Sequence, residues 1–192
     1  MTYFLRYILF SIALFRSLHG EIQQVEVTWL AGLCTTTCAQ LMVQQFQKMP
    51  AISQINMNLP SAMVFLNYKP NAPFSFIDVR NAMALVGVRY HDIHVRVRGT
   101  IQKQGNNFLI VSIGDNTPFV LVGPLSAQLS QYVTTYNIAS HPLTPYLIDQ
   151  LQQAMTYNKT VVIEGPLFMP EWSPPSYLTI SQLAFENPRQ NP

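Results

Sequence analysis

The order of strand and helix patterns between residues 25 and 98 constrains the fold of this chain most. Six segments follow one another as strand, helix, strand, strand, helix and strand. They cover residues 25–29, 38–49, 52–59, 62–68, 74–87 and 90–98. Alternation of apolar and polar residues indicates the strands, and apolar residues that recur every three to four positions indicate the helices. This order is that of the split βαβ or ferredoxin-like arrangement, so we expect an α+β fold.

The pattern changes to strands and tight turns past residue 94. Strand patterns occupy residues 94–101, 108–113, 118–122, 160–167 and 177–185, with a helix pattern at 145–157. Five strands with a helix before the fourth fit a small Greek-key barrel of the OB type, although a six-strand sheet with a packed helix fits equally. We expect a ferredoxin-like domain at 24–93 and an OB-like β-barrel domain at 94–186. The strand that closes the first domain runs into the second without a linker.

Both ends of the chain are expected to lie outside these two domains. Residues 1–20 contain Arg6, a short apolar run and no acidic residue, which is typical of a signal peptide. The run is too short to span a bilayer. We therefore expect an exported, periplasmic protein, or one anchored to the membrane by an uncleaved N-terminal segment. The tail at 187–192 is expected to be disordered.

The two cysteines, Cys34 and Cys38, stand together between the first strand and the first helix. Thr36 or Thr37 is the expected N-cap, which places Cys38 at the helix start. A helix N-terminus favours the thiolate form of a cysteine. Side chains four residues apart share a helix face, and a turn brings them about as close. The sequence therefore predicts a soft-metal or redox pair.

The surroundings of these cysteines resemble a heavy-metal-associated domain. The resemblance is carried by the strand and glycine turn at 27–38, the strand at 55–59 and the helix at 74–87 with its Gly87-Val88 ending. It covers residues 24–97. Copper chaperones, the N-terminal modules of metal-transporting ATPases and periplasmic mercury-binding proteins belong to this family. The resemblance implies a ferredoxin-like fold with a metal site in the first turn.

The family motif is Gly-Met-x-Cys-x-x-Cys, and this chain departs from it. Counted from Gly32, Cys38 stands at the second cysteine position and Thr35 occupies the first. Cys34 lies one place earlier, and Leu33 replaces the methionine. Cys38 therefore carries over directly as a metal ligand, whereas Cys34 is a displaced candidate in a Cys-x3-Cys pair.

Two thiolates suit Cu(I) or another thiophilic ion such as Hg(II), whereas tetrahedral Zn(II) needs two further ligands. The resemblance implies metal ion transport, in which copper passes by ligand exchange to a protein partner. Two alternatives stay open. One is a thiol-disulfide redox protein that acts on a partner's cysteines. The other is a non-catalytic interaction scaffold with a degenerate metal site and a structural link between Cys34 and Cys38.

Charge and motif content argue against other classes of function. Only 10% of residues are charged and the net charge is +2, which predicts no nucleic-acid partner. No nucleophile elbow, phosphate loop or metalloprotease helix occurs, so we expect no enzyme activity. His91 and His94 stand three apart on a strand and are expected on opposite faces, which disfavours a shared metal.

Overall fold

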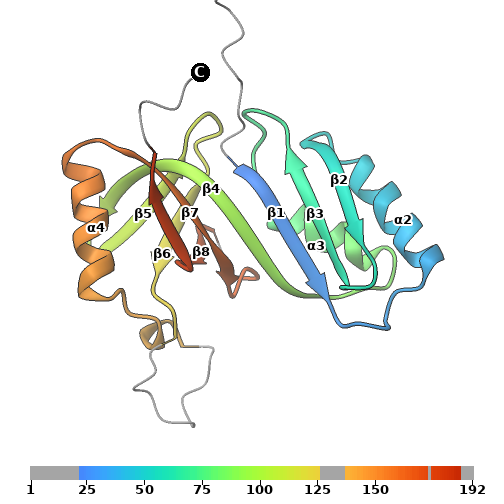
Figure 1. Ribbon diagram of the computed structural model, residues 1–192. Coiled ribbons are helices and arrows are strands. Elements are labelled where there is room, and N and C mark those ends of the chain that lie inside the picture. Colours follow the sequence, from blue (N-terminus) through green and yellow to red (C-terminus); the bar gives the residue numbers. More distant parts are fainter. Residues whose placement is uncertain (1–21, 126–136, 173, 187–192) are drawn as a thin grey trace, which may run out of the picture.

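The computed structural model describes residues 22–125, 137–172 and 174–186. The predicted signal peptide at 1–20 and the predicted tail at 187–192 lie outside these ranges. Within them the fold is α+β, with three α-helices and a nine-stranded sheet (Figure 1). The C-terminal part of that sheet closes into a five-stranded β-barrel.

The N-terminal half has the predicted order of elements. These are β1 (Ile22–Trp29), α2 (Thr36–Gln47), β2 (Ile52–Asn58), β3 (Met63–Tyr68), α3 (Phe76–Ala84) and β4 (Tyr90–Gln104). The strands lie side by side as β2-β3-β1-β4, and each neighbouring pair is antiparallel. The helices α2 and α3 contact each other and cover one face of these strands (Figure 1).

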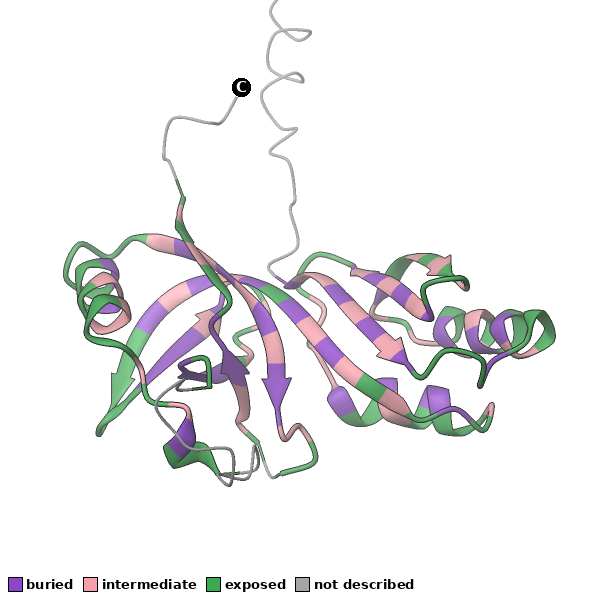
Figure 2. Ribbon diagram, turned by 60° about the horizontal axis from the view of Figure 1, so that its bottom comes forward, coloured by how far each residue is buried: buried purple, intermediate pink, exposed green. Residues whose placement is uncertain are grey.

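The spacing of apolar residues explains which faces of the strands and helices pack together. Every second residue is buried in residues 25–29 of β1, in β3 and in residues 93–101 of β4, and Figure 2 shows this alternation along the strands. In α2 the buried residues are Ala39, Met42 and Phe46, which recur at helical spacing. Fully burying a side chain as large as Phe46 stabilises a fold by about 1.5–3 kcal/mol, so these positions dominate the packing.

The second helix is shorter than the pattern predicted. α3 ends at Ala84, and Leu85 beyond it is 73% exposed. The chain turns because the N–H of Val88 donates to the carbonyl of Met83 and Gly87 adopts a φ of +76°, a left-handed conformation that favours glycine. The N–H of Gly87 also donates to the carbonyl of Ala84, so the two bonds form a Schellman motif in which Gly87 is the left-handed glycine that ends the helix.

β4 joins the two halves as one continuous strand, which confirms the predicted run-through. It pairs with β1 through residues 90–97, with β7 through 94–100 and with β5 through 99–104. A second link is the contact of Phe74 with Phe119 in the barrel, whose ring centroids are 5.9 Å apart. The buried residues of both halves form one apolar core.

The C-terminal half contains more elements than the sequence predicted. They are β5 (Asn107–Ser112), β6 (Pro118–Val122), the short 3-10 helix η2 (Ile138–Ser140), α4 (Pro145–Thr156), β7 (Thr160–Phe168), β8 (Ser176–Thr179) and β9 (Gln182–Phe185). The barrel strands follow the order β4-β5-β6-β8-β7, and β7 returns to pair with β4. Of these pairs, β6 with β8 is parallel. The sequence pattern at 177–185 predicted one strand where the structure has two.

The break between β8 and β9 lies where the chain passes Gly165 of β7. A Cβ atom on Gly165 would collide with the backbone carbonyl of Thr179, so only glycine allows this approach. The N–H of Ile180 donates to Val122 and that of Ser181 donates to Glu164. These two bonds turn the chain from the pairing of β8 to that of β9. Among the described residues, no helix is long and apolar enough to cross a membrane.

Candidate thiol site

The turn between β1 and α2 presents the two cysteines at one end of the sheet. Trp29 is the last residue of β1 and is 4% exposed, so it anchors the start of the turn in the core. The N–H of Leu33 donates to the carbonyl of Leu30 at 3.3 Å. Gly32 has a φ of +83° with open space beside it, so backbone conformation and not crowding requires glycine there.

Thr35 caps α2, one residue earlier than the predicted Thr36 or Thr37. Its side-chain oxygen accepts a hydrogen bond from the N–H of Cys38 at 3.4 Å. This bond satisfies one of the free amides of the first turn. Three consecutive threonines offer the sequence three similar caps, and the geometry of the turn selects the first. The predicted position of Cys38 in the first turn of the helix is confirmed.

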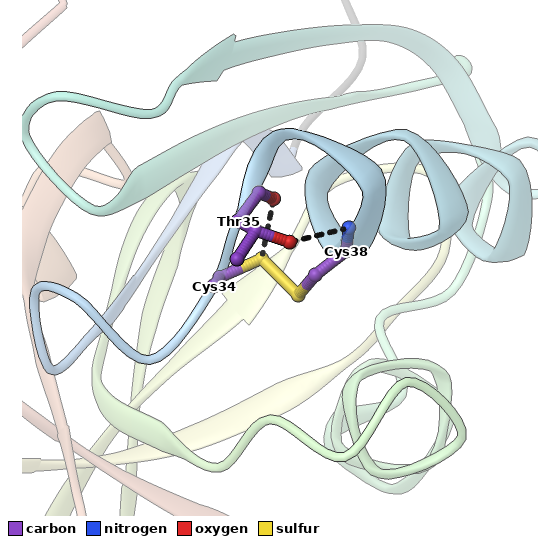
Figure 3. The surroundings of a disulfide bond; sticks show 3 residues. All are labelled: Cys34, Thr35 and Cys38. Carbon is purple, nitrogen blue, oxygen red and sulfur yellow. Dashed lines mark hydrogen bonds between the residues drawn. A yellow bond between two sulfur atoms is a disulfide. The ribbon is translucent and has the colours of Figure 1, made fainter.

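Cys34 and Cys38 are brought together and joined by a disulfide (Figure 3). Their Cα atoms are 5.3 Å apart, within the usual range for such a bond. Cys34 is buried and Cys38 is half-buried. The Cys34 sulfur lies 3.7 Å from the Thr35 carbonyl oxygen (Figure 3).

The stretch of sequence that contains the disulfide is uncharged. No charged residue occurs in the sequence between Glu26 and Lys48, and the first turn of α2 contains no acidic residue. Two leucines of the turn, Leu30 and Leu33, are 58% and 60% exposed. The helix N-terminus therefore supplies positive potential near Cys38, and no carboxylate of the first helical turn opposes it. The sequence did not predict the exposure of Leu30.

The histidines that the structure describes form no metal-holding group with the sulfurs. In the part of the chain that the structure describes, no group of three or more His, Cys, Asp or Glu side chains could hold a metal ion. His91 is exposed and lines a surface cleft with Arg80 and Glu171. His94 is paired on the sheet with Asp92, whose carboxylate lies 3.0 Å from Nε2. Within the described ranges, no third side chain of these types joins the two sulfurs in such a group.

The Asp92 partner makes His94 a pH-sensitive element of the sheet. The hydrogen bond from His94 to Asp92 raises the pKa of the histidine above its ordinary value, and the charge of Asp92 adds to this against the effect of burial. Glu26 and Glu164 on the flanking strands act in the same direction. The protonated imidazole is therefore the form that the fold stabilises.

We expect the stabilisation by His94 to be fully present below the unfolded pKa of about 6.5 and to be lost as pH rises through the higher folded value. In Asp92→Asn the pKa of His94 should fall, because its main hydrogen-bond acceptor is lost. NMR titration of the imidazole protons measures both values, with Asp149→Asn on α4 as the control. An unchanged pKa in Asp92→Asn would contradict the assignment.

Comparison with known proteins adds no family assignment. A scan against protein-family models and a search of curated proteins gave no match to this chain. The functional argument therefore depends on the geometry of the thiol site.

Proposed function

We propose that the reduced Cys34–Cys38 pair binds one soft metal ion, Cu(I) in the first place, and passes it to a protein partner. The observation that supports this most is the placement of two sulfurs together in an exposed turn, with one of them at a helix N-terminus. Cu(I) accepts two thiolate ligands, whereas Zn(II) needs four ligands.

The proposed cycle begins with the disulfide. A dithiol reductant converts it to two thiols by exchange and is itself oxidised to a disulfide, and Cu⁺ then displaces both thiol protons to form a two-sulfur complex. The partner's thiolates replace Cys34 and Cys38 in turn. Oxidation to the disulfide removes both ligands, so metal binding depends on the redox state of the pair.

The fold of the N-terminal half supports the same proposal. The element order β1-α2-β2-β3-α3-β4 and the sheet order β2-β3-β1-β4 fit the ferredoxin-like class to which heavy-metal-associated domains belong. The closed five-stranded barrel is compatible with an OB-like domain. We infer that the chain is a divergent member of that metal-binding class with an added barrel. Export through residues 1–20 stays a prediction.

A chelator-competition titration tests metal binding. The reduced protein should take one Cu(I) from micromolar bicinchoninate, whereas the disulfide form should take none. Absence of binding by the reduced protein would contradict the proposal. The disulfide form is a matched control because its sequence and fold are the same.

The exposed leucines support a protein partner that docks on the turn. Single exposed apolar residues are common on protein surfaces, but Leu30 and Leu33 adjoin the proposed metal site and lie in a sequence stretch without charge. An uncharged apolar rim suits a partner with a similar surface, because a charge there would have to be desolvated on contact. The proposed docking surface is therefore the turn itself.

Leu30→Asp is expected to slow copper transfer while leaving affinity unchanged within about threefold. The assay follows metal content after mixing loaded protein with a tagged, empty copy of the same variant. Opposed carboxylates should lower the rate at least about tenfold, since like charges across an interface cost several kcal/mol. Tyr146→Asp, at an exposed position on α4, is the control. Equal rates for both variants would argue against docking at the turn.

A second function, thiol-disulfide exchange, is favoured by the bond between Cys34 and Cys38 and by the greater exposure of Cys38. Equilibration with glutathione buffers distinguishes the two. Catalytic pairs have potentials between about −270 and −120 mV, whereas structural disulfides lie below about −300 mV. A potential in the first range together with no copper binding would make exchange the better proposal.

A further inference from the structure

The strand β2 forms one edge of the sheet, and no described strand pairs with its outer side (Figure 1). It runs over seven residues, Ile52–Asn58. Proteins protect such an edge with charged side chains, proline, a bulge or a very short strand. β2 has no charged residue and no proline, and its register irregularity lies at the start, between Ile52 and Gln54. The opposite edge is better protected, because β9 has only four residues and Glu186 beyond it pairs with Arg98.

The chain around this edge is almost free of charge. Between Glu26 and Lys69 it has one charged residue, Lys48, and this stretch contains α2, β2 and β3. Lys48 is directed towards α3, because it lines a cleft at the end of α2 together with Tyr68 and with Asp78 of α3. The outer side of β2 therefore lies in a region depleted of charge, as the core of a protein–protein interface is.

The apolar residues of β2 are less buried than those of the next strand. Ile55 and Met57 are partly buried against the core, whereas the residues opposite them on β3, Leu66 and Val64, are 0% exposed. The difference arises because β2 has a neighbouring strand on one side only. A strand added at this edge would cover more of this apolar surface, which stabilises by about 25 cal/mol per Å² buried.

The other face of β2 presents exposed amides. Gln54, Asn56 and Asn58 alternate with the apolar residues. The Gln54 side chain donates to Asn56 at 3.3 Å and accepts from Asn67 of β3 at 3.2 Å. Because an amide both donates and accepts, two identical rows of amides can hydrogen-bond to each other. Such rows also meet without the repulsion that like charges on opposed strands would cause.

We propose that β2 pairs antiparallel with β2 of a second copy of this chain, so that the two sheets continue into each other. Residues 54–58 pair regularly with β3, and Asn56 is the centre of this stretch. A two-fold axis at Asn56 sets amide opposite amide and Ile55 opposite Met57 of the second copy. A strand of another protein would have this pattern only by chance, whereas a second copy has it necessarily.

Light scattering of the full chain tests the proposal. With the Cys34–Cys38 disulfide intact, the concentrated protein should have twice the 21.8 kDa of one chain. Asn56→Lys should raise the dissociation constant of the dimer at least about tenfold, because it sets two lysines opposite each other on the axis. Asn56→Thr, which adds no charge, and Ala184→Lys, on the exposed β9 edge, are controls that should leave the dimer unchanged.

A monomeric wild type would overturn the proposal, and so would an Asn56→Lys dimer as tight as that of the wild type. Equal weakening by Ala184→Lys would place the contact elsewhere and would overturn it as well. Circular dichroism checks that Asn56→Lys keeps the fold, which is expected because Asn56 is exposed.

Asn56→Cys tests the register directly. Residues opposite each other in antiparallel strands have Cα atoms about 4.5–5.5 Å apart, within the range of a disulfide. Since Cys34 and Cys38 are bonded to each other, the introduced thiol is the free one. Diamide should oxidise two such thiols to one disulfide between copies, and mass spectrometry of the linked peptide should find it at position 56. Ala184→Cys should stay unlinked. No link in Asn56→Cys, or an equal yield in Ala184→Cys, would contradict pairing through β2.

Discussion

Replacing Cys38 by serine is expected to lower the Cu(I) affinity of the reduced protein by more than about 100-fold. Loss of residues that only orient metal ligands already costs 10–100-fold, and Cys38 is proposed as one of two ligands. Cys34→Ser should have the same effect, because neither sulfur alone holds the ion. Chelator competition under reducing conditions measures all three proteins, with Thr37→Ser in the same turn as the control.

The reducing conditions matter because the disulfide also affects stability. A bond that closes a loop of about five residues stabilises a fold by about 2 kcal/mol in the chain-entropy account. Under reducing conditions neither the wild type nor the serine variants contain the disulfide, so this difference in stability disappears. A change in Cu(I) affinity then reports on the lost sulfur itself. If Cys38→Ser bound copper as tightly as the wild type, the proposed site would be wrong.

Gly165→Val is expected to destabilise the protein by at least about 3 kcal/mol, the upper end for overpacked sites. Strand propensity favours valine by only about 1 kcal/mol, so propensity and packing predict opposite signs. Packing should prevail because the added Cβ meets the backbone of Thr179 and Ser181, which cannot rotate away. The expected Tm is lower by about 6–12 °C.

The matched control is Gly105→Asn. Gly105 has a φ of +60° and open space around it, and asparagine tolerates that conformation. Calorimetry should find this variant close to the wild type. A Gly165→Val protein as stable as the wild type would mean that the corner between β8 and β9 is not closely packed against β7.

The element order of the N-terminal half was predictable because each segment has its own apolar period. Local patterns did not reveal the break between β8 and β9. Residues 177–185 form one strand pattern, and the interruption comes from Gly165, which is distant in sequence. Long-range backbone contacts of this kind leave no local period.

The thiol site and the surface cleft at the end of α2 also differ in how far local sequence predicts them. The placement of Cys34 and Cys38 followed from a strand, a glycine turn and a helix that are adjacent in sequence. The cleft at Tyr68 could not be predicted, because α2, β3 and α3 contribute to it from three separate segments. Tyr68 follows the alternation of its strand, and that alternation does not show that its buried hydroxyl lacks a partner among the described residues.

X-ray absorption at the copper K-edge of the 1:1 complex tests the central claim most directly. For the reduced wild-type protein we expect a Cu(I) edge and a first shell of two sulfurs without nitrogen, because Cys34 and Cys38 are the cysteines of the chain and, among the described residues, no third side chain joins them in a metal-holding group. A shell that contains nitrogen, or that keeps its sulfur count in Cys38→Ser, would contradict a copper site formed by this pair.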